Sequence, residues 1–172
     1  MKNTEIVEKF YTAFSKLDHS GMEGCLSENI VYHDPMYGVL DGEPVFALWR
    51  MRCTYLHDLS IKFSNIEALD GEYAICDWEI SFFHRSAGHV TMPGKAYMRI
   101  INGKIAEHSE GYRISKWLST TYGWKGKLFG WTGYMKRREQ NYYKDMLNRF
   151  MNNELLVDDG VKRRRDYDLS DR

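Results

Sequence analysis

The sequence has few cysteines, and their number and spacing exclude two common kinds of small protein. Cys25, Cys53 and Cys76 are odd in number and widely separated, with no CxxC pair. This argues against a disulfide framework or a zinc site and favours reduced thiols, so we expect a cytoplasmic protein. The first ten residues contain acidic side chains where a secretory signal needs an apolar stretch, so none is expected.

The sequence also lacks a long apolar run and a net charge. No apolar run approaches membrane-spanning length, and Lys+Arg and Asp+Glu are both 24. A zero balance gives no electrostatic reason to expect nucleic acid or an anionic membrane, so neither is expected as a partner. The same balance gives little repulsion between copies and permits self-association. The aromatic share of 15% argues against disorder, and 172 residues favour one main domain.

The N-terminal part has helical periodicity. Apolar residues recur at helical spacing from Ile6 to Leu17, with Tyr11 beside the stripe. A short helix is expected at residues 22–26 and a strand at 30–33. Glu43 opens a further helix with Pro44 in its first turn. The apolar stripe expected on that helix consists of Phe46, Trp49, Cys53 and Leu56.

A meander of four strands is expected next. The strands are predicted at residues 59–69, 73–83, 89–101 and 105–114. The alternation of the first changes phase between Phe63 and Ile66, which predicts a β-bulge near Ser64. Asp70-Gly71 and Asn102-Gly103 are hairpin turn signals.

Two strands place polar side chains where apolar ones are the rule. The better core face of the last strand carries His108 and Glu110. Asp34 ends the first strand and is fixed by the following Pro35. Because buried carboxylates need partners, these positions are candidate site residues.

The C-terminal part is expected to be an addition to the main domain. A short helix is predicted at 116–121, an aromatic, glycine-rich loop at 124–133, and a helix at 134–152. We interpret residues 1–122 as the main domain, 123–152 as an extension that covers the domain or enlarges an interface, and 153–172 as a charged tail.

The motifs HDPMYGVLDG at 33–42 and CDWEISF at 76–82, with Trp49 between them, resemble the nuclear transport factor 2-like superfamily. The SnoaL-like and ketosteroid isomerase-like branch is the most similar. The resemblance covers roughly residues 4–122. It implies an α+β fold in which a curved, mostly antiparallel sheet wraps N-terminal helices into a cone, here with a C-terminal helical extension. It also implies an internal ligand cavity and a homodimer formed through the sheet.

Some site residues follow from the resemblance. Tyr11 matches a tyrosine that ketosteroid isomerases use in their oxyanion site, and Asp34 matches their proton-shuttling carboxylate. Ala96 stands where those enzymes have a neutral acid. Glu110 matches a carboxylate of limonene epoxide hydrolase-like members, but the inward positions on the 73–83 strand lack that branch's Arg and second carboxylate. The sequence therefore has only part of the catalytic residues of ketosteroid isomerases and only part of those of limonene epoxide hydrolases.

These observations lead to a first hypothesis, a small-molecule pocket protein. Its ligand would be an apolar ketone, polyketide or terpenoid, transformed by cofactor-free isomerisation, cyclisation or hydrolysis. Asp34 would be the base, Glu110 or His108 the acid, and Tyr11 a hydrogen-bond donor to developing charge. Expected ligand contacts are Trp49, Trp78, Met98 and Tyr112.

A second hypothesis is a non-catalytic binding or interaction module whose pocket is filled by its own aromatic side chains or opens to a partner through the C-terminal helix. In that case Asp34 caps its own loop and Glu110 is paired with His108 or an aromatic donor. No cofactor or metal is expected, because His33-Asp34 and His57-Asp58 lack a third ligand.

Overall fold

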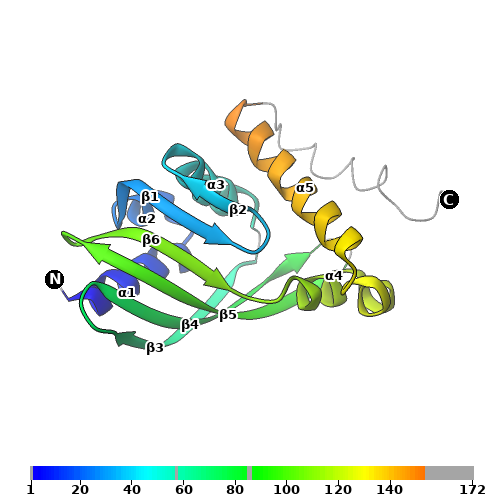
Figure 1. Cartoon of the computed structure of the whole chain (residues 1–172), viewed down its shortest axis with the longest axis horizontal. Helices are drawn as coiled ribbons and strands as arrows, with labels where there is room; N and C mark the ends of the chain where they lie inside the picture. The colour runs from blue at the N-terminus through cyan, green and yellow to red at the C-terminus, as the bar shows by residue number, and fades with distance from the viewer. Residues whose placement is uncertain (1, 57, 85–86, 154–172) are drawn as a thin grey trace.

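The computed structural model describes residues 2–56, 58–84 and 87–153, and the predicted charged tail lies outside them except for its first residue. Helices and strands are mixed along the chain (Figure 1). In order they are α1 (Asn3–Ser15), α2 (His19–Glu23), β1 (Leu26–Asp34), β2 (Gly38–Asp41), α3 (Glu43–Tyr55), β3 (Ser60–Ala68), β4 (Tyr73–His84), β5 (Gly88–Ile101), β6 (Lys104–Gly111), α4 (Ile114–Phe129) and α5 (Gly133–Met151).

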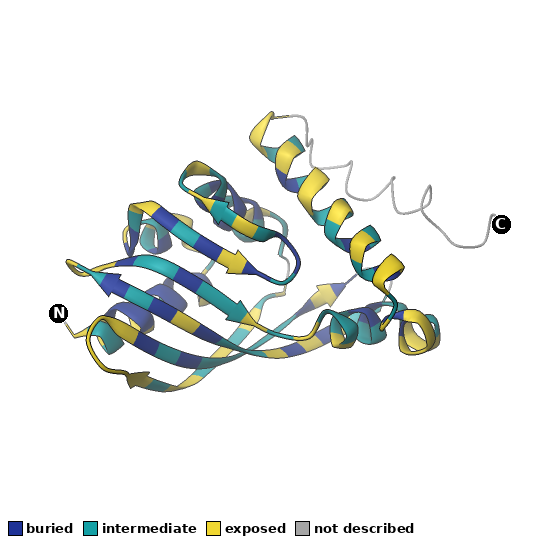
Figure 2. Ribbon diagram, viewed as in Figure 1, coloured by how far each residue is buried: buried dark blue, intermediate teal, exposed yellow. Residues whose placement is uncertain are grey.

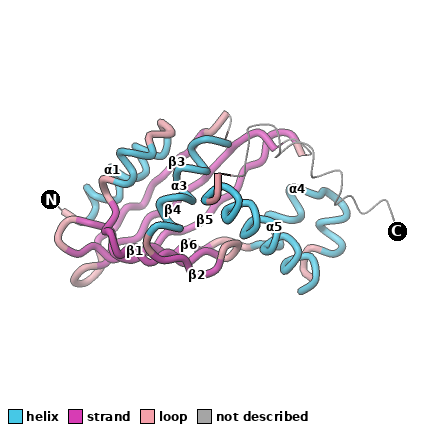
Figure 3. The backbone as a smooth tube through the Cα atoms, turned by 90° about the horizontal axis from the view of Figure 1, so that it is seen from above, coloured by secondary structure: helices cyan, strands magenta, loops and turns pink. Residues whose placement is uncertain are grey.

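The strands form one six-stranded sheet in the order β2-β1-β6-β5-β4-β3. Neighbours are antiparallel except for β1 and β6, which are parallel. The sheet curves around the helices, and α1 and α3 lie over it in the view from above (Figure 3). This confirms the predicted α+β class with a curved, mostly antiparallel sheet and N-terminal helices.

The core lies between the helices and the inner face of the sheet. Burial alternates along the strands as the period of two requires, so dark and light bands follow one another in Figure 2. Helix α1 buries Phe10, Tyr11 and Phe14 against this face and contacts β3, β4 and β5. The inner face of β6 carries His108, which is fully buried.

The turn and bulge predictions are confirmed. The β3–β4 register shifts between Ser64 and Glu67, and Asn65 has a positive φ of 52°. In the β5–β6 hairpin, Asn102 and Gly103 have φ values of 51° and 74°. A two-residue turn with positive φ at both positions matches the right-handed twist of the strands it joins.

The predicted boundaries of the early elements need correction. The first strand begins at Leu26, not at residue 30, and the helix expected at 22–26 lies at 19–23. Residues 38–41, expected in a loop, form β2, which pairs with the end of β1. That pairing closes a tight turn around Pro35. Local sequence preferences do not predict the pairing.

The predicted apolar stripe of α3 is confirmed at Trp49, and its other three members pack half-buried against the core, but further residues of the helix are buried more deeply. Its most buried residues include Val45, Leu48 and Trp49, whereas Phe46 and Cys53 are only half-buried. Helix α3 contacts α2 on one side, α5 on another, and the strands β1 and β2. Helix α3 is therefore covered from several directions at once, and more of its surface is buried than one apolar stripe predicts.

The extension is helical almost throughout. Residues 124–129, expected in a loop, belong to α4, which bends at Gly123 with φ 58° and ψ −130°. The bend folds the end of α4 back so that Gly126 lies against the backbone of Leu118, where a Cβ would collide. Helix α5 confirms the helix predicted at 134–152 and packs on α3 and α4. The predicted domain boundary after residue 122 stays a prediction.

Among the residues that the structure describes, no helix is long and apolar enough to cross a membrane. Cys25, Cys53 and Cys76 are free thiols.

Candidate functional site

The side chain of Asp34 is fully buried at the end of β1 and accepts five hydrogen bonds. Its Oδ1 accepts from the backbone N–H groups that follow Pro35 and from one phenol, and its Oδ2 accepts from a second phenol and a guanidinium. The donors are Met36 N (2.6 Å), Tyr37 N (2.9 Å), Tyr112 Oη (2.9 Å), Tyr32 Oη (3.0 Å) and Arg52 Nη2 (3.3 Å). A carboxylate offers about four lone-pair sites, so the hydrogen-bonding capacity of this one is fully used.

Arg52 comes from the last turns of α3, and its side chain is 21% exposed. Its guanidinium lies over the rings of Trp49, Tyr37 and Tyr32, with centroid distances of 4.8, 5.5 and 5.9 Å. Burial alone would lower the pKa of Arg52. The electrostatic effects of Tyr32 and Asp34 are larger together, so the pKa of Arg52 is raised. The pair therefore fastens α3 to the turn after β1.

Helix α5 reinforces this turn from outside the sheet. Gln140 donates from its amide to the Pro35 carbonyl at 2.8 Å. The ring of Tyr143 contacts that of Tyr37 at a centroid distance of 5.9 Å. We call Asp34, its five donors and these two α5 contacts the Asp34 network.

Glu110 lies on β6 in a second polar group. Its side chain is 6% exposed, and its Oε2 accepts a hydrogen bond from Trp78 Nε1 at 2.5 Å. Trp78 reaches it from β4 by crossing β5 at Gly94, where a Cβ would collide with the indole. Ala96, directly opposite Glu110 on β5, is also small. These two positions leave room for the Trp78–Glu110 pair.

His108 lies one inward position before Glu110 on the same strand. Its Nε2 is 2.9 Å from Glu110 Oε1, but the ring N–H is not aligned for a hydrogen bond. Aromatic rings surround it: Tyr32 at 5.1 Å, Phe10 at 5.4 Å and Trp49, stacked, at 5.9 Å between centroids. The imidazole is therefore held in place by packing while its nitrogens stay available.

Four buried polar atoms around Glu110 have no hydrogen-bond partner among the described residues. They are Tyr11 Oη, Trp49 Nε1 and both ring nitrogens of His108. Burial, with the nearby charge of Glu110 as a second cause, raises the pKa of Tyr11 well above its usual value. The phenol stays protonated at neutral pH and remains a donor. Glu110, Trp78 and the three residues that carry these atoms form what we call the Glu110 cluster.

The structure separates the predicted site residues into two groups. Asp34 and Tyr112 belong to the Asp34 network, whereas Tyr11, His108 and Glu110 belong to the cluster with Trp49 and Trp78. Met98 is buried and lies opposite His108 in the β5–β6 register.

Sequence reasoning missed Arg52 and Tyr32. Tyr32 precedes Asp34 by two residues and shares its face of β1, so the strand period could have found it. Arg52 follows Trp49 by three residues on α3, a spacing that places both on one side of the helix. Tyr32 also connects the two groups, because its hydroxyl binds Asp34 and its ring contacts His108.

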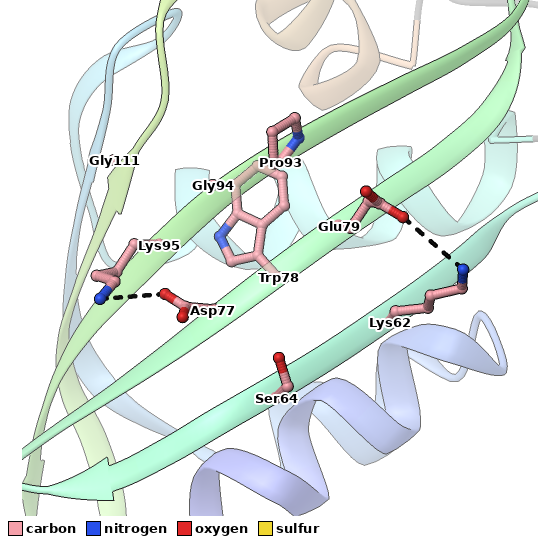
Figure 4. A pocket seen from close by; sticks show the side chains of 9 residues that line it. All are labelled: Lys62, Ser64, Asp77, Trp78, Glu79, Pro93, Gly94, Lys95 and Gly111. Carbon is pink, nitrogen blue, oxygen red and sulfur yellow. Dashed lines mark ion pairs between the residues drawn. The ribbon is translucent and has the colours of Figure 1, made fainter.

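A shallow hollow of about 550 Å³ lies on the opposite, outer face of the sheet. Figure 4 shows it between β3, β4 and β5, with ion pairs from Lys95 to Asp77 at 3.1 Å and from Lys62 to Glu79 at 3.9 Å. Trp78 borders it beside Gly94, so this residue contributes to the hollow as well as to the Glu110 cluster. The hollow is open and is lined by charged side chains together with Trp78 and Pro93, unlike the aromatic interior.

Within the described part of the chain, no three His, Cys, Asp or Glu side chains converge as metal ligands. The polar groups of the Glu110 cluster are two indole nitrogens, one imidazole, one phenol and one carboxylate.

Comparison with known proteins identifies the family. The model of the SnoaL-like domain matches residues 7–108. The chain belongs to the SnoaL-like family. Its architecture is that of the nuclear transport factor 2-like superfamily, to which ketosteroid isomerase-like proteins also belong. No curated protein matches the chain.

Solved structures support the same fold for this SnoaL-like protein. A proposed polyketide cyclase from Pseudomonas putida KT2440 is 21% identical, with a TM-score of 0.60 over 70% of this chain and 98% of its own. A protein of ketosteroid isomerase-like fold from Catenulispora acidiphila, solved with trimethylamine, is 14% identical, with a TM-score of 0.61 over 69% and 92%. AclR, a proposed hydroxylase from Streptomyces galilaeus, is 16% identical, with a TM-score of 0.58 over 67% and 92%. At these identities the likeness establishes the fold alone.

Proposed function

We propose that this SnoaL-like protein binds a small, largely apolar molecule carrying a carbonyl or similar oxygen, and that Glu110 moves a proton on it. The oxygen would lie beside Tyr11, Trp49 and His108. A ketone, a polyketide or a terpenoid-like molecule has this chemistry. Isomerisation, cyclisation and hydrolysis are three outcomes of such a proton transfer.

The single observation that carries this proposal is the set of unpartnered donors around Glu110. A buried polar group without a partner costs about 1–3 kcal/mol, so native cores rarely keep several side by side. Among the described residues Trp49 Nε1 has no hydrogen-bond acceptor, and Tyr11 Oη has no aligned partner although Glu110 is close enough to raise its pKa, so both can donate to an oxygen of a bound molecule. An oxygen acceptor inside an aromatic enclosure satisfies both and buries the apolar remainder of the molecule.

The chemistry follows from the placement of one carboxylate in that enclosure. Glu110 takes a proton from carbon next to the carbonyl, and Tyr11 stabilises the negative charge that develops on oxygen. Because the pKa of Tyr11 is raised, its hydroxyl stays protonated throughout. His108, 2.9 Å from Glu110, can carry the proton onward.

In this proposal Asp34 has a different role from the base that the resemblance implies. All its acceptor sites are engaged and it faces Arg52. Asp34 would position Tyr32 and Trp49, through Arg52, at the edge of the Glu110 cluster. It acts as a positioning residue.

A second candidate, a ligand-binding or interaction module without catalysis, is favoured by one feature. The rings of Phe10, Tyr32 and Trp49 already enclose His108, and the described hollow lies on the outer face. A homodimer formed through the sheet also remains a proposal.

The test is a thermal-shift screen with apolar ketones, lactones and epoxides on the wild type, Glu110→Gln and Glu107→Gln. Glu107 carries the same carboxylate on the outer face of the same strand, where it pairs with Arg99, so it is the matched control. We expect one chemical class to raise the Tm of the wild type and of Glu107→Gln but not of Glu110→Gln.

Proton transfer is then measured directly. Incubation of the responding compound in D₂O should replace hydrogen next to its carbonyl with deuterium, and Glu110→Gln should abolish the exchange. Binding without exchange would favour the non-catalytic module. No response from a folded protein to any compound would contradict the pocket itself.

A further inference from the structure

The end of α4 and the turn into α5 expose a concentrated group of large apolar side chains. Trp131 is 71% exposed and Trp124 is 68% exposed. We define the aromatic turn by its five exposed residues, Trp124, Leu128, Phe129, Trp131 and Tyr134. Soluble surfaces seldom keep so many large apolar residues within eleven consecutive positions, and such patches usually mark an interaction site.

The local backbone holds these side chains outward. The chain bends at Gly123, and Gly126 then packs against the backbone of Leu118. The side of the last helical turn that carries Gly126 therefore faces the protein. Trp131 Nε1 donates to the Leu128 carbonyl at 2.8 Å, so its one polar atom is satisfied while its ring stays exposed. The turn lies at the end of the molecule opposite α1, and much of it is exposed (Figure 2).

Charge is distributed unevenly along the chain in a way that the zero total hides. Residues 113–151 have nine basic and two acidic side chains, a net charge of +7, whereas residues 1–112 have ten basic and sixteen acidic, a net charge of −6. Five basic and no acidic residues accompany the aromatic turn at 124–138: Lys125, Lys127, Lys136, Arg137 and Arg138. Asymmetry of this kind indicates a polyanionic surface as partner.

We propose that the aromatic turn docks on an anionic lipid bilayer. Trp and Tyr, apolar at one end and polar at the other, suit the headgroup region, and Lys and Arg between them attract acidic lipids. The docking is peripheral and needs no spanning helix. It is independent of the Glu110 cluster.

The test is co-sedimentation of the full-length protein with phosphatidylcholine vesicles, with and without about 30% phosphatidylserine, at two salt concentrations. We expect binding to the phosphatidylserine vesicles that weakens at high salt. The double variant Trp124→Ser/Trp131→Ser should bind at least about tenfold less, because two apolar anchors are lost. Lys125→Glu/Lys127→Glu should also lose binding, through charge alone.

The matched control is Tyr73→Ser/Tyr97→Ser, because these residues are 46% and 50% exposed and lie on the sheet, with Tyr73 at the end of β4 opposite the one that contacts α4. It should bind as the wild type does. Absence of binding to phosphatidylserine vesicles, or binding that survives both turn variants, would overturn the proposal. So would a wild-type dimer, seen by sedimentation velocity without lipid, that Trp124→Ser/Trp131→Ser converts to monomer, because a second copy would then cover the turn.

Discussion

Asp34 and Glu110 are both buried carboxylates on the inner side of one sheet, but their surroundings differ. Asp34 accepts five hydrogen bonds and faces a guanidinium. Glu110 accepts one aligned hydrogen bond and is surrounded by polar atoms that have no partner among the described residues. A carboxylate whose acceptor sites are all hydrogen-bonded is typical of a structural network. Buried polar atoms without hydrogen-bond partners are typical of a place where a ligand binds.

The largest expected effect on stability comes from disrupting the Asp34 network, in which the acceptor sites of Asp34 are all engaged. Asp34→Asn leaves Arg52 without its counter-charge and supplies fewer acceptor sites for the same donors. We expect a loss of about 3–5 kcal/mol in the free energy of unfolding, measured by urea denaturation. Adding Arg52→Met should recover part of that loss. A change below about 1 kcal/mol for Asp34→Asn would show that the network does not stabilise the fold.

A pair of tyrosine variants compares the two regions with the same chemical change. Tyr112→Phe removes a hydrogen bond to Asp34 and should cost about 1.5–3 kcal/mol of unfolding free energy. Tyr11→Phe removes a hydroxyl that has no aligned partner among the described residues and lies near Glu110, so it should cost clearly less than Tyr112→Phe. Equal losses in both variants would remove the distinction between the regions.

The Trp78 side chain lies across β5 at Gly94, so a substitution at this one position tests its role. Gly94→Ala places a methyl group where the indole lies, so Trp78 must move away from Glu110. We expect a loss of about 1–3 kcal/mol and of the ligand-induced Tm shift. Gly24→Ala, where a Cβ meets its nearest atoms at 3.4 Å, is the control and should keep the shift. Retention of the shift in Gly94→Ala would separate Trp78 from the site.

Alkaline pH tests the buried phenols of both regions. Burial, aided by a neighbouring carboxylate, raises the pKa of Tyr11 and of Tyr112 above 10.0. Below about pH 9 these phenols are protonated in the folded and unfolded chains, so stability is unaffected. Above pH 10 the unfolded chain ionises first, and each phenol lowers the unfolding free energy by about 1.4 kcal/mol per pH unit.

Tyr11→Phe should therefore make the alkaline decline shallower by about that amount, as measured by urea denaturation between pH 7 and pH 10.5. Cys76, whose pKa burial and Glu110 raise to about 11, adds to the decline equally in both proteins. An unchanged slope in Tyr11→Phe would mean that this phenol is not buried in solution.

Much of the fold follows from the sequence because its signals are local. The alternation in β3 to β6, the bulge at Ser64 and the Asn102-Gly103 turn depend on short-range backbone preferences. The same alternation placed His108 and Glu110 on the inner face. Local signals do not report contacts between distant elements: α3 is covered by α2, α5 and two strands at once, and residues 124–129 are helical beyond the bend at Gly123.

The limits of sequence reasoning at the site have the same origin. An arginine in the apolar pattern of α3 gives no local signal of burial, yet Asp34 and three rings stabilise the charge of Arg52 in the interior. Whether a buried donor has a partner depends on atoms from several elements at once. The unpartnered nitrogens of Trp49 and His108 could therefore be found only in three dimensions.

The most direct test of the central claim is the indole N–H region of ¹H–¹⁵N spectra, recorded with and without a compound that raises the Tm. Trp49→Phe assigns the Trp49 signal, and Trp117, which donates to Glu139 in the extension, is an internal reference. We expect the signals of Trp49, and of Trp78 beside Glu110, to shift on binding while that of Trp117 stays in place. A fixed Trp49 signal with a shifted Trp117 signal would contradict this expectation, because the compound would then bind outside the Glu110 cluster.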